Sequence, residues 1–300
     1  MKYSLRKITS VLILSFMWIH SSGQNTSFTK LGDLPPRLFE SSGLEYTRDS
    51  TGDNVWTIVD SNLAILFCLD STGQIKKAIH LNNVNHGWED LSQDDQGNFY
   101  IGDFGNNFNK RKDLKIYKIP SPDSIKEKVI TAEIIQFHYP DQHEFPPKPH
   151  LKNFDMDAMV CFGNSIYLFS KNSSTPFTGY TKMYRLPNAP GNYTAELVDS
   201  LYLGPGYKYN TWVTGADLSP DKKTLAILTQ DKVWLFTCFK GDAFLKGKKQ
   251  TIQLNHFSQK EGICFRDNET LFISDERTEN ILGGSLYTLK LNKAEHDDCK

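Results

Sequence analysis

The sequence contains few cysteines, and their arrangement specifies no chemistry. Five of its 300 residues are cysteine, and no CxxC pair or Cys/His cluster occurs. Neither a disulfide framework nor a zinc site is therefore predicted. Four cysteines fall in apolar, strand-like runs and the fifth lies near the C-terminus: Cys68, Cys161, Cys238, Cys264 and Cys299. We expect buried thiols that act as small hydrophobes, and oxidation of one pair after export remains open.

The sequence also lacks an excess of charge, a low-complexity tract and a sustained helical period. Its formal net charge is −1. No stretch is dense enough in lysine and arginine for nucleic acid, so that class of partner is excluded. Apolar residues nowhere keep a 3.6-residue period over three turns, which excludes a helical bundle. No segment after residue 23 is long and apolar enough to be expected to span a membrane.

The first 23 residues have the pattern of an export signal. A positive start with Lys2, Arg6 and Lys7 precedes the apolar run ITSVLILSFMWI, and the small residues SSG follow. We expect residues 1–23 to be a cleaved signal peptide and residues 24–300 to form a single domain, secreted or periplasmic. The domain would carry a net charge of about −4. We expect it to be a monomer.

Five short segments repeat along the rest of the chain. Each opens with an oxygen-bearing side chain, has an apolar residue two positions later and leads into an apolar strand. The opening residues are Ser42, Glu89, Asp157, Thr214 and Glu261. The second strand of each repeat ends on Asp60, Asp103, Lys171, Gln230 or Asp275. The third strand carries an aromatic residue: Phe67, Tyr117, Tyr184, Trp234 or Tyr287.

These strands predict an all-β fold, a five-bladed β-propeller. Alternating apolar and polar residues bounded by Gly, Asn, Asp and Pro are typical of antiparallel strands. Four-stranded units repeated around an axis form a propeller. A fourth strand follows in the first four repeats, but the chain ends soon after the third strand of the fifth. We expect residues 27–34 (SFTKLGDL) to complete blade five, because an open ring would leave an exposed edge.

The topology predicts that the opening residues meet at one end of the channel. The innermost strand of a blade starts at one face and the second strand returns to it. Carboxylates brought close to one axis repel each other unless they bind protons or a cation, and an irregular all-oxygen set suits calcium better than magnesium. The predicted Ca2+ ligands are Ser42, Glu89, Asp157, Thr214 and Glu261. The alternative is that these residues only form turns and caps.

The first functional hypothesis is a calcium-dependent hydrolase of a phosphate-containing or similarly anionic small molecule. The ion would polarise an oxygen and orient water, and a nearby carboxylate would act as base. The predicted catalytic acids are Asp60, Asp103 and Asp275. The predicted anion-binding cations are Arg111, Lys171 and Arg277. The alternative for these cations is a solvated rim paired with neighbouring acids.

Two other classes of function stay open. In a non-catalytic binding propeller the channel ion would only connect the blades, and the inserted loop with His143, Glu144 and His150 would contact an extracellular protein, glycan or peptide. In a glycoside hydrolase two carboxyls would flank the scissile bond. Trp88 or Trp212, near opening residues, would then form a sugar platform. Packing inside the blade is the alternative for Trp88.

At the opening residues the chain resembles the calcium-activated nucleotidase (apyrase) propellers. The resemblance implies five blades and a central calcium with one side chain per blade, in the order Ser, Glu, Glu, Ser, Glu; here the order is Ser, Glu, Asp, Thr, Glu. The Arg-rich substrate segment of that family is replaced here by SKNSSTPFTGY. The stretch GWEDLSQDDQGNFYIGDFGNN also looks like the blades of secreted propellers of the SdiA-regulated and esterase-like phytase types. That second resemblance implies a fold and export rather than a reaction.

Overall fold

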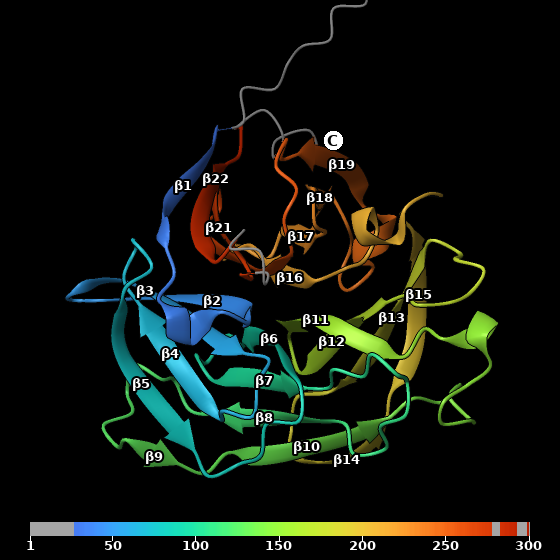
Figure 1. The fold of residues 1–300 in the computed structure, drawn as a ribbon, viewed down its shortest axis with the longest axis horizontal. Helices are drawn as coiled ribbons and strands as arrows, with labels where there is room; N and C mark the ends of the chain where they lie inside the picture. Colours follow the sequence, from blue (N-terminus) through green and yellow to red (C-terminus); the bar gives the residue numbers. More distant parts are fainter. Residues whose placement is uncertain (1–26, 278–282, 293–298, 300) are drawn as a thin grey trace, which may run out of the picture.

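The chain forms five β-sheets arranged around a central axis (Figure 1). The computed structural model describes residues 27–277, 283–292 and 299, so the signal peptide expected at residues 1–23 lies outside the described residues. Each sheet is one blade. The innermost strands are β2 (Ser41–Asp49), β6 (Trp88–Gln93), β11 (Asp155–Phe162), β16 (Gly215–Leu218) and β20 (Lys260–Asp267). Each of these strands contacts the innermost strand of both neighbouring blades, and the circuit closes from β20 back to β2. This closed ring confirms the predicted all-β, five-bladed propeller.

The other strands follow outward in chain order, each antiparallel to the one before it. The second strands are β3 (Gly52–Val59), β7 (Phe99–Asp103), β12 (Ser165–Lys171), β17 (Thr224–Leu228) and β21 (Thr270–Asp275). The third strands are β4 (Ile65–Leu69), β8 (Lys115–Ile119), β13 (Tyr180–Pro187), β18 (Lys232–Thr237) and β22 (Ser285–Lys290). The fourth strands are β5 (Ile75–Leu81), β10 (Glu133–His138), β15 (Glu196–Tyr202) and β19 (Lys248–Gln253).

Blade five is completed by a strand from the other end of the chain. The strand β1 (Ser27–Asp33) pairs antiparallel with β22, from Ser27 opposite Lys290 to Asp33 opposite Ser285. Its bounds agree with the segment predicted to close the ring. Because β1 supplies the fourth strand of the last blade, the backbone edge of β22 is paired instead of exposed.

Two short strands that the sequence did not predict extend blades one and two. The strand β9 (Val129–Ile130), from the chain of blade two, pairs parallel with β5 of blade one. The strand β14 (Gly191–Thr194), from the chain of blade three, pairs parallel with β10 of blade two. Each covers the outer edge of the preceding blade. The described connections also contain the 3-10 helices η1 (Pro36–Leu38), η2 (Pro149–Leu151), η3 (Lys208–Asn210) and η4 (Phe244–Lys246). None of the helices in the described residues has the length and apolar character needed to cross a membrane.

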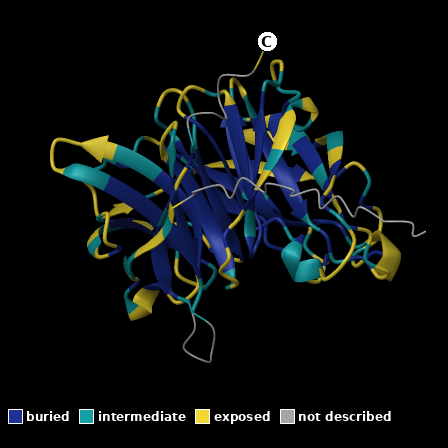
Figure 2. Cartoon of the chain, turned by 90° about the horizontal axis from the view of Figure 1, so that it is seen from above, coloured by how far each residue is buried: buried dark blue, intermediate teal, exposed yellow. Residues whose placement is uncertain are grey.

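The apolar core lies within and between the blades. Buried residues fill the strands, whereas exposed residues gather in the loops (Figure 2). Trp56 of blade one meets Phe99 of blade two edge-on, with ring centroids 5.9 Å apart. Val160 of blade three and Leu218 of blade four belong to a single buried cluster. Packing between blades therefore leaves the channel mouth to polar residues.

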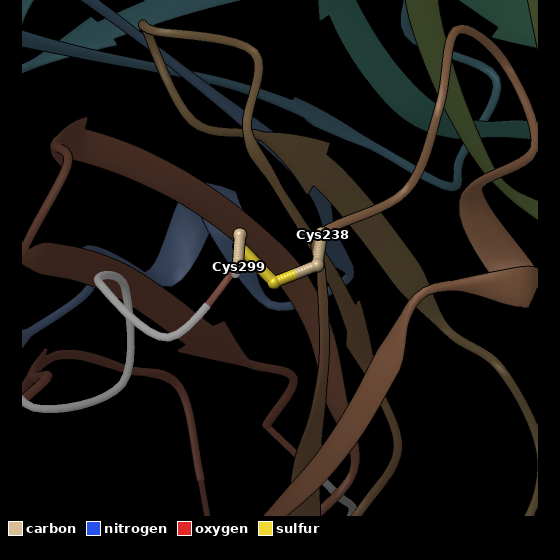
Figure 3. The surroundings of a disulfide bond; sticks show 2 residues. All are labelled: Cys238 and Cys299. Carbon is tan, nitrogen blue, oxygen red and sulfur yellow. A yellow bond between two sulfur atoms is a disulfide. The ribbon is translucent and has the colours of Figure 1, made fainter.

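The cysteines depart from the prediction in one respect. Cys68, Cys161 and Cys264 are buried free thiols, as expected. Cys238 and Cys299, however, form a disulfide bond with their Cα atoms 5.2 Å apart (Figure 3). Cys238 follows β18 of blade four and Cys299 follows β22 of blade five. The bond therefore ties the C-terminal end of the chain to blade four. A sequence separation of 61 residues left this pair without a recognisable spacing motif.

Candidate functional site

The acidic opening residues are placed by irregularities in the innermost strands. In blades two, three and five the register with the second strand shifts at Glu89, Asp157 and Glu261, respectively. A β-bulge of this kind bends the strand and re-aims one side chain, and bulges are frequent beside active sites. All three side chains are buried. The bulges explain why these acids leave the packed faces of their blades.

The two hydroxyl-bearing opening residues lie in more regular backbone. The backbone N–H of Thr214 donates to the carbonyl of Leu228 at 3.1 Å, and its buried hydroxyl has no hydrogen-bond partner. Ser42 is buried beside a register shift at Gly43. Gly43 has a φ of +59°, and a Cβ there would lie 2.7 Å from the Cα of Asp90. Glycine is thus required for the close approach of blades one and two.

The ammonium group of Lys171 lies among the acids. Its Nζ forms an ion pair with the carboxylate of Asp157, and the Lys171 side chain is 14% exposed. Burial opposes the charge of Lys171, but the carboxylates of Asp157, Glu261 and Asp155 raise the pKa of this lysine well above its usual value. Lys171 is therefore charged at every physiological pH, and it is the cation that the cluster holds.

Six carboxyl groups share this ammonium. They are Asp60, Glu89, Asp155, Asp157, Glu261 and Glu276, and these residues with Lys171 are called the central cluster below. Burial is the largest cause of a raised pKa in each of them. It raises the pKa of Asp60 to about 6, of Glu261 to about 7 and of Glu276 to about 9, in each case with added repulsion from neighbouring carboxylates. For Asp157 the Lys171 ammonium opposes the effect of burial on the pKa. The cluster therefore combines protonated and ionised carboxyls near neutral pH.

Two of the predicted catalytic acids brace their own blades. Asp103 accepts a hydrogen bond from the Tyr117 hydroxyl at 3.4 Å, and Asp275 accepts one from the Tyr287 hydroxyl at 2.9 Å. Both carboxylates are fully buried. In each case the tyrosine is on the third strand and the acid is at the end of the second strand. The observed contacts thus assign these two acids to the interior of their blades.

The second-strand residues that reach the central cluster lie one position later. Counted from the residue opposite the third-strand aromatic, Asp60 corresponds to Lys171 and Glu276. A shift of one residue moves a side chain to the other face of a strand. The predicted column was therefore correct for Asp60 and Lys171, and one residue early for Glu276.

The predicted anion-binding cations separate in the same way. Arg111 lies 3.0 Å from Asp103 and 3.1 Å from Asp113, and it donates to the carbonyl of Gly105 at 3.0 Å. The guanidinium of Arg277 lies 4.8 Å from the centre of the Phe39 ring. Within the described part of the chain, Lys171 is the one of the three that forms an ion pair with the central cluster.

Sequence reasoning missed a further tier of residues, each two positions before an opening residue. These residues are Glu40, Asp155, Trp212 and Gln259. Asp155 accepts a hydrogen bond from the backbone N–H of Asn106 at 2.6 Å. The side chain of Gln259 donates to the Glu276 carboxylate. Residues i and i+2 of a strand share a face, so the opening residues themselves were the signal that pointed to this tier.

The two tryptophans considered as sugar platforms have different surroundings. Trp88 is fully buried and packs against Tyr117, with ring centroids 5.9 Å apart. Trp212 is partly exposed, and its ring centre lies 5.3 Å from Nζ of Lys171. Trp212 is thus the one of the two that borders the central cluster.

The donor set does not match the predicted calcium site. Among the residues that the structure describes, no three His, Cys, Asp or Glu side chains are arranged to hold a metal ion. Asp157, a predicted ligand, is already paired with the Lys171 ammonium. A cation of the protein itself therefore neutralises part of the charge that calcium was expected to balance. Calcium binding by these residues stays a prediction.

Comparisons with known proteins add no family assignment. No family model and no curated protein matches the chain. Among solved structures, virginiamycin B lyase from Staphylococcus aureus is similar with 14% identity and a TM-score of 0.41, over 86% of this chain and 69% of the lyase. The PQQ-bound aldose sugar dehydrogenase from Streptomyces coelicolor is similar with 11% identity and a TM-score of 0.46, over 88% and 98%. A carbohydrate-active enzyme from Trichoderma reesei is similar with 8% identity and a TM-score of 0.48, over 90% and 96%. These likenesses are distant, and no activity is transferred from them.

Proposed function

We propose that the central cluster binds a neutral carbohydrate and hydrolyses a glycosidic bond. The observation that carries this proposal is the convergence of three bulge-borne carboxyls on Lys171, next to the partly exposed Trp212. Glycoside hydrolysis requires one carboxylic acid that donates a proton and a second carboxylate that is ionised. Environments that drive the protonation states of neighbouring carboxyls apart provide such a pair.

The charge of the cluster favours a neutral ligand over an anionic one. Six carboxyls face a single ammonium, and Arg111 is held by Asp103 and Asp113. An incoming phosphate would meet carboxylates at short range, where the repulsion is strongest. Hydroxyl groups of a sugar instead donate hydrogen bonds to carboxylates and accept them from protonated carboxyls. The hydrolase of phosphate-containing substrates is therefore the less favoured form of the enzyme hypothesis.

The two carboxyl roles are assigned from their surroundings. Glu261 has a pKa raised to about 7, so a large fraction is protonated at neutral pH, and it is the proposed proton donor to the glycosidic oxygen. Asp157 is held beside the Lys171 ammonium, and it is the proposed ionised carboxylate that acts as nucleophile or activates water. Lys171 positions Asp157 and favours its charged form.

The test is the release of reducing ends from a panel of soluble polysaccharides and aryl glycosides by residues 24–300. We expect Glu261→Gln and Asp157→Asn each to lower turnover by about 10²–10⁴-fold. Glu144→Gln is the control, since Glu144 is exposed on the loop before η2 and should keep wild-type turnover. Full turnover by both cluster variants would refute the assignment.

A non-catalytic binding propeller is the second candidate. The Lys171–Asp157 ion pair lies within blade three and joins its first two strands, which is also a structural role. In that case the panel would contain a sugar that binds without release of reducing ends. The same set of proteins, titrated with the same sugars, separates binding from hydrolysis.

A further inference from the structure

We propose that the loop at residues 204–213 carries an aromatic platform for a second sugar unit, so that the ligand of the channel mouth is an oligosaccharide chain. This inference rests on the proposed function and specifies its substrate class. The platform consists of Tyr207, Tyr209 and Trp212. The loop connects blade three to blade four, between β15 and β16.

The three rings form a continuous row. The ring centroids of Tyr207 and Tyr209 are 4.8 Å apart, and those of Tyr209 and Trp212 are 4.6 Å apart. Tyr207 is 65% exposed, so the outer end of the row is open to solvent. Aromatic rings packed for stability alone are normally covered by other apolar groups. An exposed row beside a polar site has the character of a ligand-binding surface.

The inner end of the row is fixed against the central cluster. The indole Nε1 of Trp212 donates to the backbone carbonyl of Asn172 at 2.5 Å. Asn172 directly follows Lys171, whose ammonium pairs with Asp157 and lies 5.3 Å from the Trp212 ring centre. A chain bound at the carboxyls therefore meets the platform as its next contact in this direction.

The charges around the rings favour a neutral ligand there as well. The Lys208 ammonium lies 4.8 Å from the centre of the Trp212 ring and 5.1 Å from that of Tyr209. With Lys171 on the same indole, two cations already interact with these π-systems. A cationic ligand would be repelled by both lysines, whereas a sugar stacks its C–H face on a ring and offers hydroxyl oxygens to Lys208. The platform thus selects an uncharged polyhydroxylated unit.

The experiment measures affinity as a function of chain length. Glu261→Gln, which is expected to block cleavage, is titrated calorimetrically with cello-, xylo-, malto- and chito-oligosaccharides of one to six units. We expect affinity for one series to rise at least tenfold between the monosaccharide and the longer chains. Tyr207→Ala, added to the same protein, should remove about tenfold of that gain. Tyr207 is exposed, so its removal should not impair folding.

Tyr202→Ala is the matched control. Tyr202 is 45% exposed on β15 and stacks with Tyr180, away from the platform residues, and its loss should leave every affinity unchanged. A series that binds equally well at all lengths, or with equal affinity after Tyr207→Ala, would overturn the platform and leave the proposed function standing. Absence of binding in all four series, together with absence of hydrolysis by the wild type, would overturn both.

Discussion

Replacement of Glu261 by glutamine should stabilise the protein at pH 8 and have little effect on its stability at pH 5. Glu261 is 4% exposed, and burial is the main reason why its pKa rises from the usual 4.5 to about 7. A carboxyl whose pKa is raised by folding contributes stability below the unfolded pKa, and this contribution is lost as the pH rises through the folded pKa. At 1.36 kcal/mol per pKa unit, the ionised Glu261 costs about 3 kcal/mol above pH 7. Glutamine has nearly the same shape and removes that cost.

The assay is urea unfolding followed by tryptophan fluorescence at several pH values between 5 and 8. The free energy of unfolding of Glu261→Gln should exceed that of the wild type by about 3 kcal/mol at pH 8, with the difference vanishing between pH 7 and pH 5. Glu144→Gln, on an exposed loop, should show no such pH dependence. An equal loss of stability at both ends of the range would refute the reasoning. It would mean that the hydrogen bond from Gln259 and local packing matter more than the buried charge.

Three other perturbations test the cluster and the disulfide. Lys171→Met should destabilise the protein by about 3–5 kcal/mol at pH 8, because it leaves buried carboxylates without their cation; urea unfolding at pH 5, where these carboxyls bind protons, should show a smaller loss. Cys238→Ser should cost about 4 kcal/mol, because the bond closes a loop of 61 residues; a reducing agent should give the wild type the same loss and leave the variant unchanged. Calcium at a hundred times its dissociation constant would add about 2.7 kcal/mol of stability over chelator. Because Lys171 already pairs with Asp157, we expect less in a thermal unfolding assay, and a full shift that Glu89→Ala abolishes would establish the ion.

The fold was predictable because the propeller repeats its constraints. Every blade has an opening polar residue, two buried strands and a third-strand aromatic, and five such blocks leave few architectures open. The closing strand was predictable for a topological reason. Residues 27–33 were the unpaired strand-like segment, and blade five lacked a fourth strand. The strands β9 and β14 were not predictable, since two and four residues paired parallel to a neighbouring blade leave no periodic pattern.

The site was predictable in composition but not in full register. The spacing of fourteen residues from opening residue to second-strand end made Asp103, Lys171 and Asp275 look equivalent. The bulge in blade three falls one residue deeper into the strand pairing than the bulges in blades two and five. This difference changes which residue at the strand end faces the channel. Constant spacing in the sequence thus hid a change of side.

The third-strand aromatic shows which acids are structural. Blades two and five have Tyr117 and Tyr287 there, and each tyrosine hydroxyl donates to the acid two residues beyond its second-strand partner. Blade one has Phe67, which has no hydroxyl. Its acid is Asp60, one residue further along, and Asp60 joins the central cluster. A tyrosine in this column therefore predicts a buried brace.

Blade three carries a lysine where blades one and five carry acids, and this difference organises the chemistry of the site. Lys171 corresponds in register to Asp60 and Glu276. A seventh carboxyl at that position would leave no cation in the cluster, and burial with mutual repulsion would keep most of the acids protonated. With lysine there, Asp157 has a partner that favours its ionised form, while Glu261 stays near its midpoint at neutral pH. The single basic residue of the column thus separates a proton donor from an ionised carboxylate, and that separation is what a two-carboxyl hydrolytic mechanism requires.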